Sequence, residues 1–351
     1  MDTMSYRLER GTTKQGKTKY FLVKYIKVGK KAARVRRYIK SGDTPTAGEL
    51  QKFGKEHAAS IEAEALNKAA ELSSSRYIGQ YISKDEIQLV ERVRYLYKAF
   101  TNVLTTNELK KCEEDFEVSY VSGTTSIEGN TLSTKETYDL LVNDIIPSGK
   151  SAREINEVQN FKRVLACRDK YRGRITIKLI KSLHAIIVNN IDYESAGSFR
   201  RSDFIGISGC DLRVTPSFEI EDELKHAIDD YYNNIKAGGY PFEEAILFHY
   251  KFEMIHPFTD GNGRVGRELL NYLLIRNRPS YPKLLFLGKD RPTYIQALKL
   301  GNDEKYKEMI TFFADLIIRQ RLEVLLKNFE NMIESQAKPR GQMKLTDYVN
   351  I

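Results

Sequence analysis

From Lys84 almost to the end of the chain, apolar residues recur at the spacing of three to four that is typical of amphipathic helices. Two expected helix starts carry a capping box, in which a serine side chain binds the N3 amide and a glutamate reaches back: Ser133 with Glu136, and Ser151 with Glu154. The expected helices cover residues 84–103, 106–119, 133–143, 151–170, 176–190, 219–236, 241–255, 263–277, 291–300 and 304–333. The pattern therefore predicts a mainly α fold.

One stretch, residues 197–216, interrupts these helices. Two short runs, Phe204–Ile207 and Leu212–Thr215, flank the turn-forming residues Ser208–Asp211. Short apolar runs on either side of such a turn are typical of a β-hairpin. We expect a hairpin that is inserted in the helical domain.

The N-terminal residues have a different pattern. Aromatic and β-branched residues alternate in short runs over residues 5–40, with Gly-containing turns at 11–17 and 29–31, which predicts a three-stranded antiparallel sheet. The Ala- and Glu-rich segment from about residue 47 to 72 predicts a helix. The chain of 351 residues is thus expected to comprise a β module, a linker helix, a helical domain and a loose tail, at residues 1–45, 46–80, 81–335 and 336–351.

The positive charge of the chain is concentrated at its start. Residues 1–40 hold 13 of the 56 basic side chains and only 2 of the 47 acidic ones, so the remaining residues are close to neutral. A basic module that also contains aromatic residues could bind nucleic acid through phosphate contacts. An acidic protein partner, or a basic surface that contacts only solvent, explains the same charge.

The composition excludes several other classes of protein. No apolar run approaches the roughly 18 residues of a membrane span, and residues 1–17 lack the apolar stretch of a signal peptide, so we expect a cytoplasmic protein without a membrane partner. Cys112, Cys167 and Cys210 are far apart in sequence and have no metal-ligand spacing. A disulfide scaffold or a zinc site is therefore not expected.

A phosphate-loop motif near the start has the wrong context. Residues 11–18, GTTKQGKT, match the pattern GxxxxGK[ST] letter for letter. The motif binds phosphate only where a helix follows directly, because the helix N-terminus adds its partial positive charge to the loop amides. Here the next residues alternate as a strand, so we interpret the match as a turn between strands.

The segment from Phe248 to Arg267 carries the chemistry. Its helical pattern stops at Pro257 and resumes after Gly263, so a short loop joins two helices. Gly261 and Gly263 lack side chains, which lets backbone N–H groups at the start of the second helix face an anion. Arg264 and Arg267, three residues apart on one helix face, add two guanidinium groups suited to phosphate oxygens. The arrangement is typical of a polyphosphate site.

Two further residues of this loop fit the same chemistry. Asp260 supplies a hard oxygen ligand for Mg²⁺, which usually binds one or two protein carboxylates together with phosphates. His256 can take a proton from a hydroxyl group near neutral pH.

The sequence HPFTDGNGRVGR, residues 256–267, matches throughout the signature HPFx[D/E]GN[G/K]RxxR of the Fic (Fido) family. This resemblance implies a protein adenylyltransferase that moves AMP from ATP to a Tyr, Ser or Thr hydroxyl of a target protein. His256 would be the general base and Asp260 the Mg²⁺ ligand. The loop amides of Gly261 and Gly263, together with Asn262 and Arg264, would hold the phosphates. The glycine at position 263 resembles the nucleotidylating members of the family, because the branch that works as a kinase carries Lys at this position.

The resemblance extends over roughly residues 85–331 and implies a Fic-type helical bundle with a β-hairpin flap. The flap would lay the target segment beside the active site by strand pairing, through Phe204, Ile205, Gly206 and Ile207. Tyr294 and Asn302 lie in a segment that resembles the one closing over adenine and ribose. Relatives often dimerise through this core, which leaves a homodimer open.

Residues 124–130, TTSIEGN, resemble the family's inhibitory motif [S/T]xxxE[G/N], on an inhibitory helix expected at about residues 106–130. If Glu128 pairs with Arg267, that arginine cannot bind the γ-phosphate, and the α-phosphate of ATP is badly placed for attack. The resemblance therefore implies low basal activity.

Three alternatives stay open at the level of sequence. Some relatives use the same glutamate to remove AMP from a modified target, so Glu128 could serve a de-AMPylase. A nucleic-acid-binding regulator with a nucleotide-sensing Fic core is a second alternative. The donor could also be UTP, GTP or a choline diphosphate.

The remaining histidines, each within a helical pattern, are expected to be packing or surface residues: His57, His184, His226 and His249.

Overall fold

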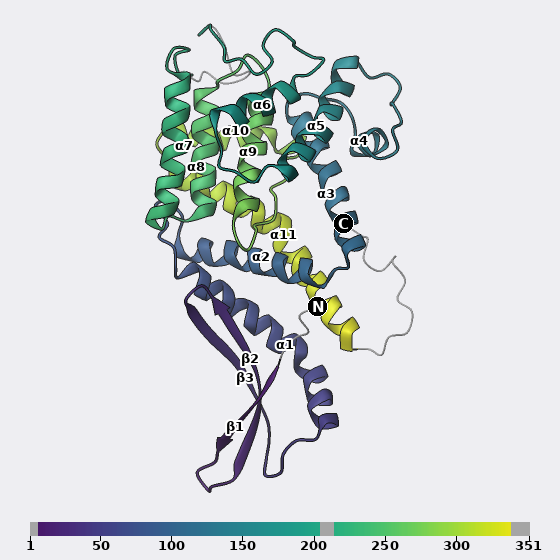
Figure 1. Cartoon of the computed structure of the whole chain (residues 1–351), viewed down its shortest axis with the longest axis vertical. Coiled ribbons are helices and arrows are strands. Elements are labelled where there is room, and N and C mark those ends of the chain that lie inside the picture. The colour runs from purple at the N-terminus through teal and green to yellow at the C-terminus, as the bar shows by residue number, and fades with distance from the viewer. Residues whose placement is uncertain (1–5, 204–213, 338–351) are drawn as a thin grey trace. The chain divides into compact units, whose positions relative to one another are not determined.

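The computed structural model describes residues 6–203 and 214–337 (Figure 1). It confirms the mainly α fold and the N-terminal three-stranded antiparallel sheet. The described elements are β1 (Arg7–Thr12), β2 (Thr18–Val28), β3 (Lys31–Ser41), α1 (Ala47–Ser74), α2 (Lys84–Val103), α3 (Thr106–Ile127), α4 (Thr134–Leu141), α5 (Ala152–Lys170), α6 (Ile177–Ile187), α7 (Ile220–Ala237), α8 (Pro241–Ile255), α9 (Asn262–Arg276), a short 3-10 helix (Gly288–Asp290), α10 (Arg291–Asn302) and α11 (Tyr306–Ala337).

The chain forms two compact units. The first contains residues 1–78, 83–103 and 317–351, and the second contains residues 79–82 and 104–316. The predicted domain boundaries stay predictions. Among the described helices, none combines the length and the apolar composition needed to cross a membrane.

In the first unit, the sheet has the strand order β1-β2-β3 and packs one face against α1 (Figure 1). Leu22, Ile26 and Val35 of the sheet join Ile61 and Ala65 of α1 in a buried cluster. Apolar burial of this kind stabilises a sheet that would be marginal alone.

The phosphate-loop match falls between two strands, because β1 ends at Thr12 and β2 begins at Thr18. Strand pairing joins these two residues, so the motif forms a hairpin turn. No helix follows the motif, which confirms the interpretation as a turn.

The second unit is helical, and α8 and α9 lie at its centre (Figure 1). Phe242 and Phe252 of α8 and Val265 and Leu269 of α9 have no exposed surface. Both capping boxes predicted from the sequence are present, at the starts of α4 and α5. Because both central helices are held by buried side chains, the loop that joins them has fixed ends.

Helix α3 corrects the helix end that the apolar periodicity predicts, since it runs to Ile127 rather than ending near residue 119. Ser122, Gly123 and Thr124 are poor helix formers. All three are buried, so tertiary packing stabilises the helix where propensity does not. The extension carries the helix to Glu128, its C-cap residue.

Gly123 allows the close approach of α3 to the segment before α10. A Cβ added at this residue would lie 2.2 Å from the carbonyl oxygen of Phe286. We expect Gly123→Ala to lower the melting temperature by several degrees, because overpacking of this kind costs about 1–3 kcal/mol. Gly48→Ala in α1 is the matched control, since an added Cβ there contacts nothing within 4 Å. Equal melting of Gly123→Ala and the unchanged chain would contradict the packing described here.

Candidate active site

The loop between α8 and α9 has a fixed backbone. Helix α8 ends at Ile255, and His256 adopts the left-handed conformation, with φ 49°, directly before Pro257. The Asn262 side chain closes the loop: its Oδ1 accepts from the Phe258 amide at 2.9 Å, and its Nδ2 donates to the Phe258 carbonyl at 2.7 Å. Residues 258–262 therefore form a rigid turn at the N-terminus of α9.

His256 is held through its backbone by a buried arginine. Arg200 Nε donates to the His256 carbonyl oxygen at 2.8 Å, and Arg200 Nη2 donates to the Ile255 carbonyl oxygen at 3.2 Å. Burial lowers the pKa of His256, and the Arg200 charge acts in the same direction. The imidazole is therefore neutral at pH 7, as a general base requires.

Asp260 lies in a network of ion pairs. Its carboxylate accepts from Arg264 Nη2 at 2.9 Å, Arg153 Nη2 at 2.5 Å and the Gly261 amide at 2.5 Å. Glu157 pairs with the other side of Arg264, at 3.2 Å from Nη1. Burial opposes ionisation, but Arg264, the Gly261 amide and Arg153 together outweigh it and lower the pKa of Asp260. Asp260 is therefore an ionised oxygen donor.

Asp260 can hold Mg²⁺ only if a bound phosphate compound supplies further oxygen ligands to the metal. No group of three or more His, Cys, Asp or Glu in residues 6–203 and 214–337 is placed to hold a metal ion. Mg²⁺ commonly binds one or two carboxylates and completes its shell with phosphate oxygens and water. The donor set thus suits a metal that arrives with a nucleotide.

Glu128 and Arg267 form an ion pair beside the loop. Glu128 Oε1 lies 2.7 Å from Arg267 Nη2, and Arg267 is 1% exposed. Arg267 also donates to the Thr124 hydroxyl at 2.8 Å and to the Thr124 carbonyl at 2.9 Å. Burial works against the Glu128 charge, but Arg267 outweighs it and lowers the pKa of the carboxyl.

Glu128 also covers the start of α9. A Cβ added at Gly263 would lie 2.4 Å from Glu128 Oε1 and 2.8 Å from Arg267 Nη1. The carboxylate therefore stands directly against the backbone of the Gly-rich turn.

The charges of this cluster balance. Three arginines, Arg153, Arg264 and Arg267, meet three carboxylates, Glu128, Glu157 and Asp260. Removal of Glu128 leaves one positive charge in excess, next to the partial positive charge of the α9 N-terminus. An anionic polyphosphate would balance that charge.

A second buried layer lies behind Arg267. Burial raises the pKa of Glu253 to about 8, against the effect of Arg267, and lowers the pKa of His249 to about 3. His249 Nε2 lies 2.8 Å from the Tyr294 hydroxyl, and the Tyr294 ring centre is 5.8 Å from the Arg267 guanidinium. Burial thus favours the neutral forms of Glu253 and His249, and Glu128 is the carboxylate that pairs with Arg267.

The structure brings together most of the residues singled out in the sequence. The loop and the first turns of α9 carry His256, Asp260, Gly261, Asn262, Gly263, Arg264 and Arg267, and α3 brings Glu128 to them. Tyr294 packs behind Arg267. Asn302 instead accepts a hydrogen bond from the Tyr250 hydroxyl at 2.8 Å. The predicted flap positions Phe204, Ile205, Gly206 and Ile207 lie outside the described residues.

Sequence reasoning missed three residues that build this site: Arg200, Glu157 and Glu253. The spacing of four between Arg153 and Glu157 was the one available signal, since such pairs meet on a helix. His184 is a packing residue, stacked on Phe258 with ring centres 3.7 Å apart. It also supports the loop, because its Nε2 lies 3.0 Å from the Asp260 carbonyl oxygen.

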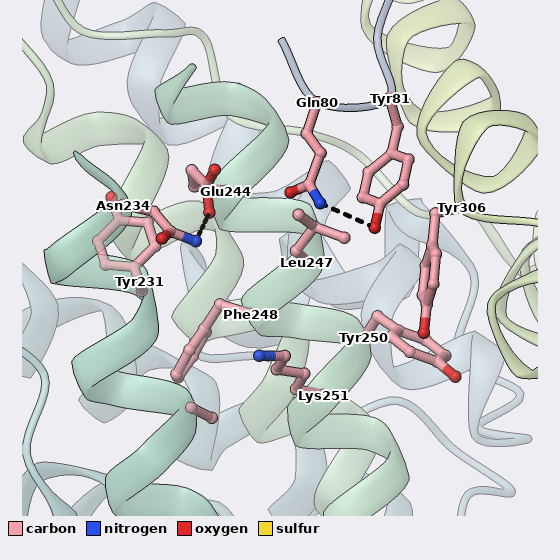
Figure 2. A pocket seen from close by; sticks show the side chains of 11 residues that line it. Gln80, Tyr81, Tyr231, Asn234, Glu244, Leu247, Phe248, Tyr250, Lys251 and Tyr306 are labelled. Carbon is pink, nitrogen blue, oxygen red and sulfur yellow. Dashed lines mark hydrogen bonds between the residues drawn. The ribbon is translucent and has the colours of Figure 1, made fainter. Parts of the chain in front are cut away.

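A separate pocket of about 260 Å³ lies between α7, α8 and the start of α11 (Figure 2). In Figure 2, Tyr81, Tyr250 and Tyr306 line one side, and Asn234 donates to Glu244 on the other. Of the described residues that line it, Lys251 is the one cation, and Lys251 pairs with Asp230 at 2.6 Å. This pocket is therefore poorly suited to a polyphosphate.

Known proteins resemble this chain in sequence and in fold. Residues 174–274 match the sequence model of the Fic/DOC family. The chain is 29% identical over 273 residues to protein adenylyltransferase fic-1 of Caenorhabditis elegans, which covers 76% of this chain and 52% of the relative. It is 29% identical over 250 residues to protein adenylyltransferase Fic of Aedes aegypti, covering 70% and 49%. The chain thus spans about half the length of the curated relatives it matches.

Solved structures share the fold. A Fic domain containing signaling protein from Bacteroides thetaiotaomicron aligns with a TM-score of 0.60 at 23% identity, over 71% of this chain and 99% of that one. A fragment of Fic-1 from C. elegans aligns with a TM-score of 0.61 at 23% identity, over 82% of this chain and 87% of that one. The signature, the fold and the family match agree: residues 174–274 of this chain are similar to the Fic/DOC family.

Proposed function

We propose that this chain is an autoinhibited protein adenylyltransferase that transfers AMP from Mg-ATP to a Tyr, Ser or Thr hydroxyl of a target protein. The observation that carries the proposal is the placement of His256, Asp260, Arg264 and Arg267 around one Gly-rich helix start, with Glu128 bound to Arg267. The names of the curated relatives support the same activity.

In the proposed reaction, the hydroxyl oxygen of the target attacks the α-phosphorus of ATP. The new O–P bond forms as the bond between the α-phosphorus and the bridging oxygen to the β-phosphate breaks, and pyrophosphate leaves. His256 accepts the hydroxyl proton. Asn262 fixes the turn through its two bonds to Phe258, so the amides of Asn262 and Gly263 can hold phosphate oxygens without reorganisation, whereas the Gly261 amide must first leave Asp260. Mg²⁺ held by Asp260 would neutralise phosphate charge.

Glu128 acts as the brake in this proposal. While its carboxylate holds Arg267, the γ-phosphate lacks its cation, and the α-phosphate is not aligned for in-line attack. Activity then requires that Glu128 leave Arg267, for example when a partner binds α3.

The pH dependence tests the role of His256. In Glu128→Gly, we expect the labelling rate to stay constant around neutral pH and to fall only below the ordinary histidine pKa of about 6.5, because the pKa of His256 is lowered and only the neutral ring accepts a proton. The check is the rate with ATP labelled at the α-phosphate, measured across acid and neutral buffers. A midpoint at or above the ordinary value would contradict this environment for His256.

Removal of AMP from a modified target is the second candidate function. A third of the Glu128 side chain is exposed, so its carboxylate can contact a water molecule beside the loop. Release of AMP from a modified protein by the unchanged chain, lost in Glu128→Gln, would support this reaction.

A further inference from the structure

The sheet of the first unit has one face that α1 does not cover. On this outer face, alternate residues of the three strands point away from α1, and most are well exposed: Arg7, Tyr25, Lys27, Arg34, Arg36 and Tyr38. Tyr25 and Tyr38 are each 51% exposed, although large aromatic side chains are usually buried. The outer face therefore presents cations and aromatic rings together.

Three basic residues that face α1 are neutralised there. Lys24 pairs with Glu62, Arg37 with Glu64 at 2.7 Å, and Lys40 with Glu49 at 2.7 Å. The outer face receives no such partners from α1, and in sequence Glu9 is the one acidic residue of the three strands. The outer face thus keeps much of the excess positive charge of the module.

Glu9 offsets one positive charge of this face and also orders it. Its carboxylate accepts from Tyr25 Oη and from Arg34 Nη1, and lies 3.4 Å from Arg36 Nε. The hydrogen bond from Tyr25 lowers the pKa of Glu9 most, with help from the two arginines. Arg36 also lies over the Phe21 ring, 3.5 Å from its centre. Two guanidinium groups are therefore held in place on the outer face, which reduces the entropy lost when they bind an anion.

We propose that the outer face binds duplex DNA through its phosphate backbone, an activity separate from that of the Fic domain. Duplex DNA offers a dense row of negative charges, and arginine forks match phosphate geometry. The major groove of B-DNA is wide enough for β-strands, and several DNA-binding proteins place strands there. The deep, narrow major groove of duplex RNA does not admit them. An acidic protein lacks the regular phosphate spacing, so DNA is favoured.

The test measures binding of the full chain to a fluorescent random-sequence DNA duplex by anisotropy, at about 50 to 200 mM salt. Arg7→Gln/Lys27→Gln/Arg34→Gln removes three outer-face charges. The matched control, Lys178→Gln/Lys236→Gln/Lys307→Gln, removes three exposed charges of the second unit and has the same net charge. Duplex RNA and polyglutamate of equal length serve as competing ligands.

We expect a Kd on the order of 10⁻⁴ to 10⁻⁶ M near physiological salt. The slope of the logarithm of the binding constant against the logarithm of the salt concentration should fall in magnitude by about 0.9 for each phosphate ion pair that a variant removes. The outer-face variant should bind at least tenfold more weakly, and the control should bind as the unchanged chain does. If the triple variant misfolds, Lys27→Gln alone should still reduce the magnitude of the slope. The proposal is overturned by absence of DNA binding at the lowest salt, by equally weakened binding in the control, or by tighter binding of RNA or polyglutamate.

Discussion

Glu128→Gly should label itself with AMP on the order of 10² to 10³ times faster than the unchanged chain, because it frees a buried arginine whose loss from an electrostatic site has an effect of that size. Arg267 keeps its two hydrogen bonds to Thr124, so the guanidinium should stay where a γ-phosphate can reach it. The chain has 21 tyrosines, which makes self-modification a usable substitute for the unknown target. The measurement is incorporation of α-phosphate label from ATP in the presence of Mg²⁺.

Two further variants separate the effect of removing the Glu128 charge from the effect of removing its whole side chain. Glu128→Gln removes the charge but keeps the size of the side chain, so its labelling rate should fall between those of the unchanged chain and Glu128→Gly. Glu113→Gln changes an exposed glutamate of the same helix and should leave the rate unchanged. Equal rates in the unchanged chain and Glu128→Gly would contradict the brake.

His256→Ala in the Glu128→Gly background should lower labelling by about 10² to 10⁴, the usual contribution of a general base. Without the imidazole, the end of α8 loses the group that the proposal assigns as proton acceptor. Affinity for Mg-ATP should change little, because the phosphate contacts come from the loop amides and the arginines.

His226→Ala is the matched control for that variant. His226 lies on α7 with a side chain 73% exposed, so its removal should leave the labelling rate unchanged. Calorimetric titration with a non-hydrolysable ATP analogue checks that binding survives in His256→Ala. A variant that still binds and labels at the full rate would exclude His256 as the base.

Local sequence patterns were sufficient to predict the elements and the loop of the site. Capping boxes mark the starts of α4 and α5, and Pro257 with Gly261 and Gly263 marks the turn between α8 and α9. These signals could be read because helix propensity and capping depend on residues that are close together in sequence.

The supporting residues could not be predicted because they come from distant segments. Arg200 reaches the end of α8 across 56 residues, and Glu157 meets Arg264 from another helix, α5. Their roles arise from packing, which fixes where two helices meet. The apolar periodicity underestimated the length of α3 for the same reason: burial of Ser122, Gly123 and Thr124 outweighs their low helix propensity.

The most direct test of the central claim is the intact mass of Glu128→Gly after incubation with Mg-ATP. The account predicts a mass increase of one or more AMP groups, absent when His256 is also replaced by alanine. A mass increase of phosphate alone, or an AMP adduct that persists without His256, would contradict adenylyl transfer by this site.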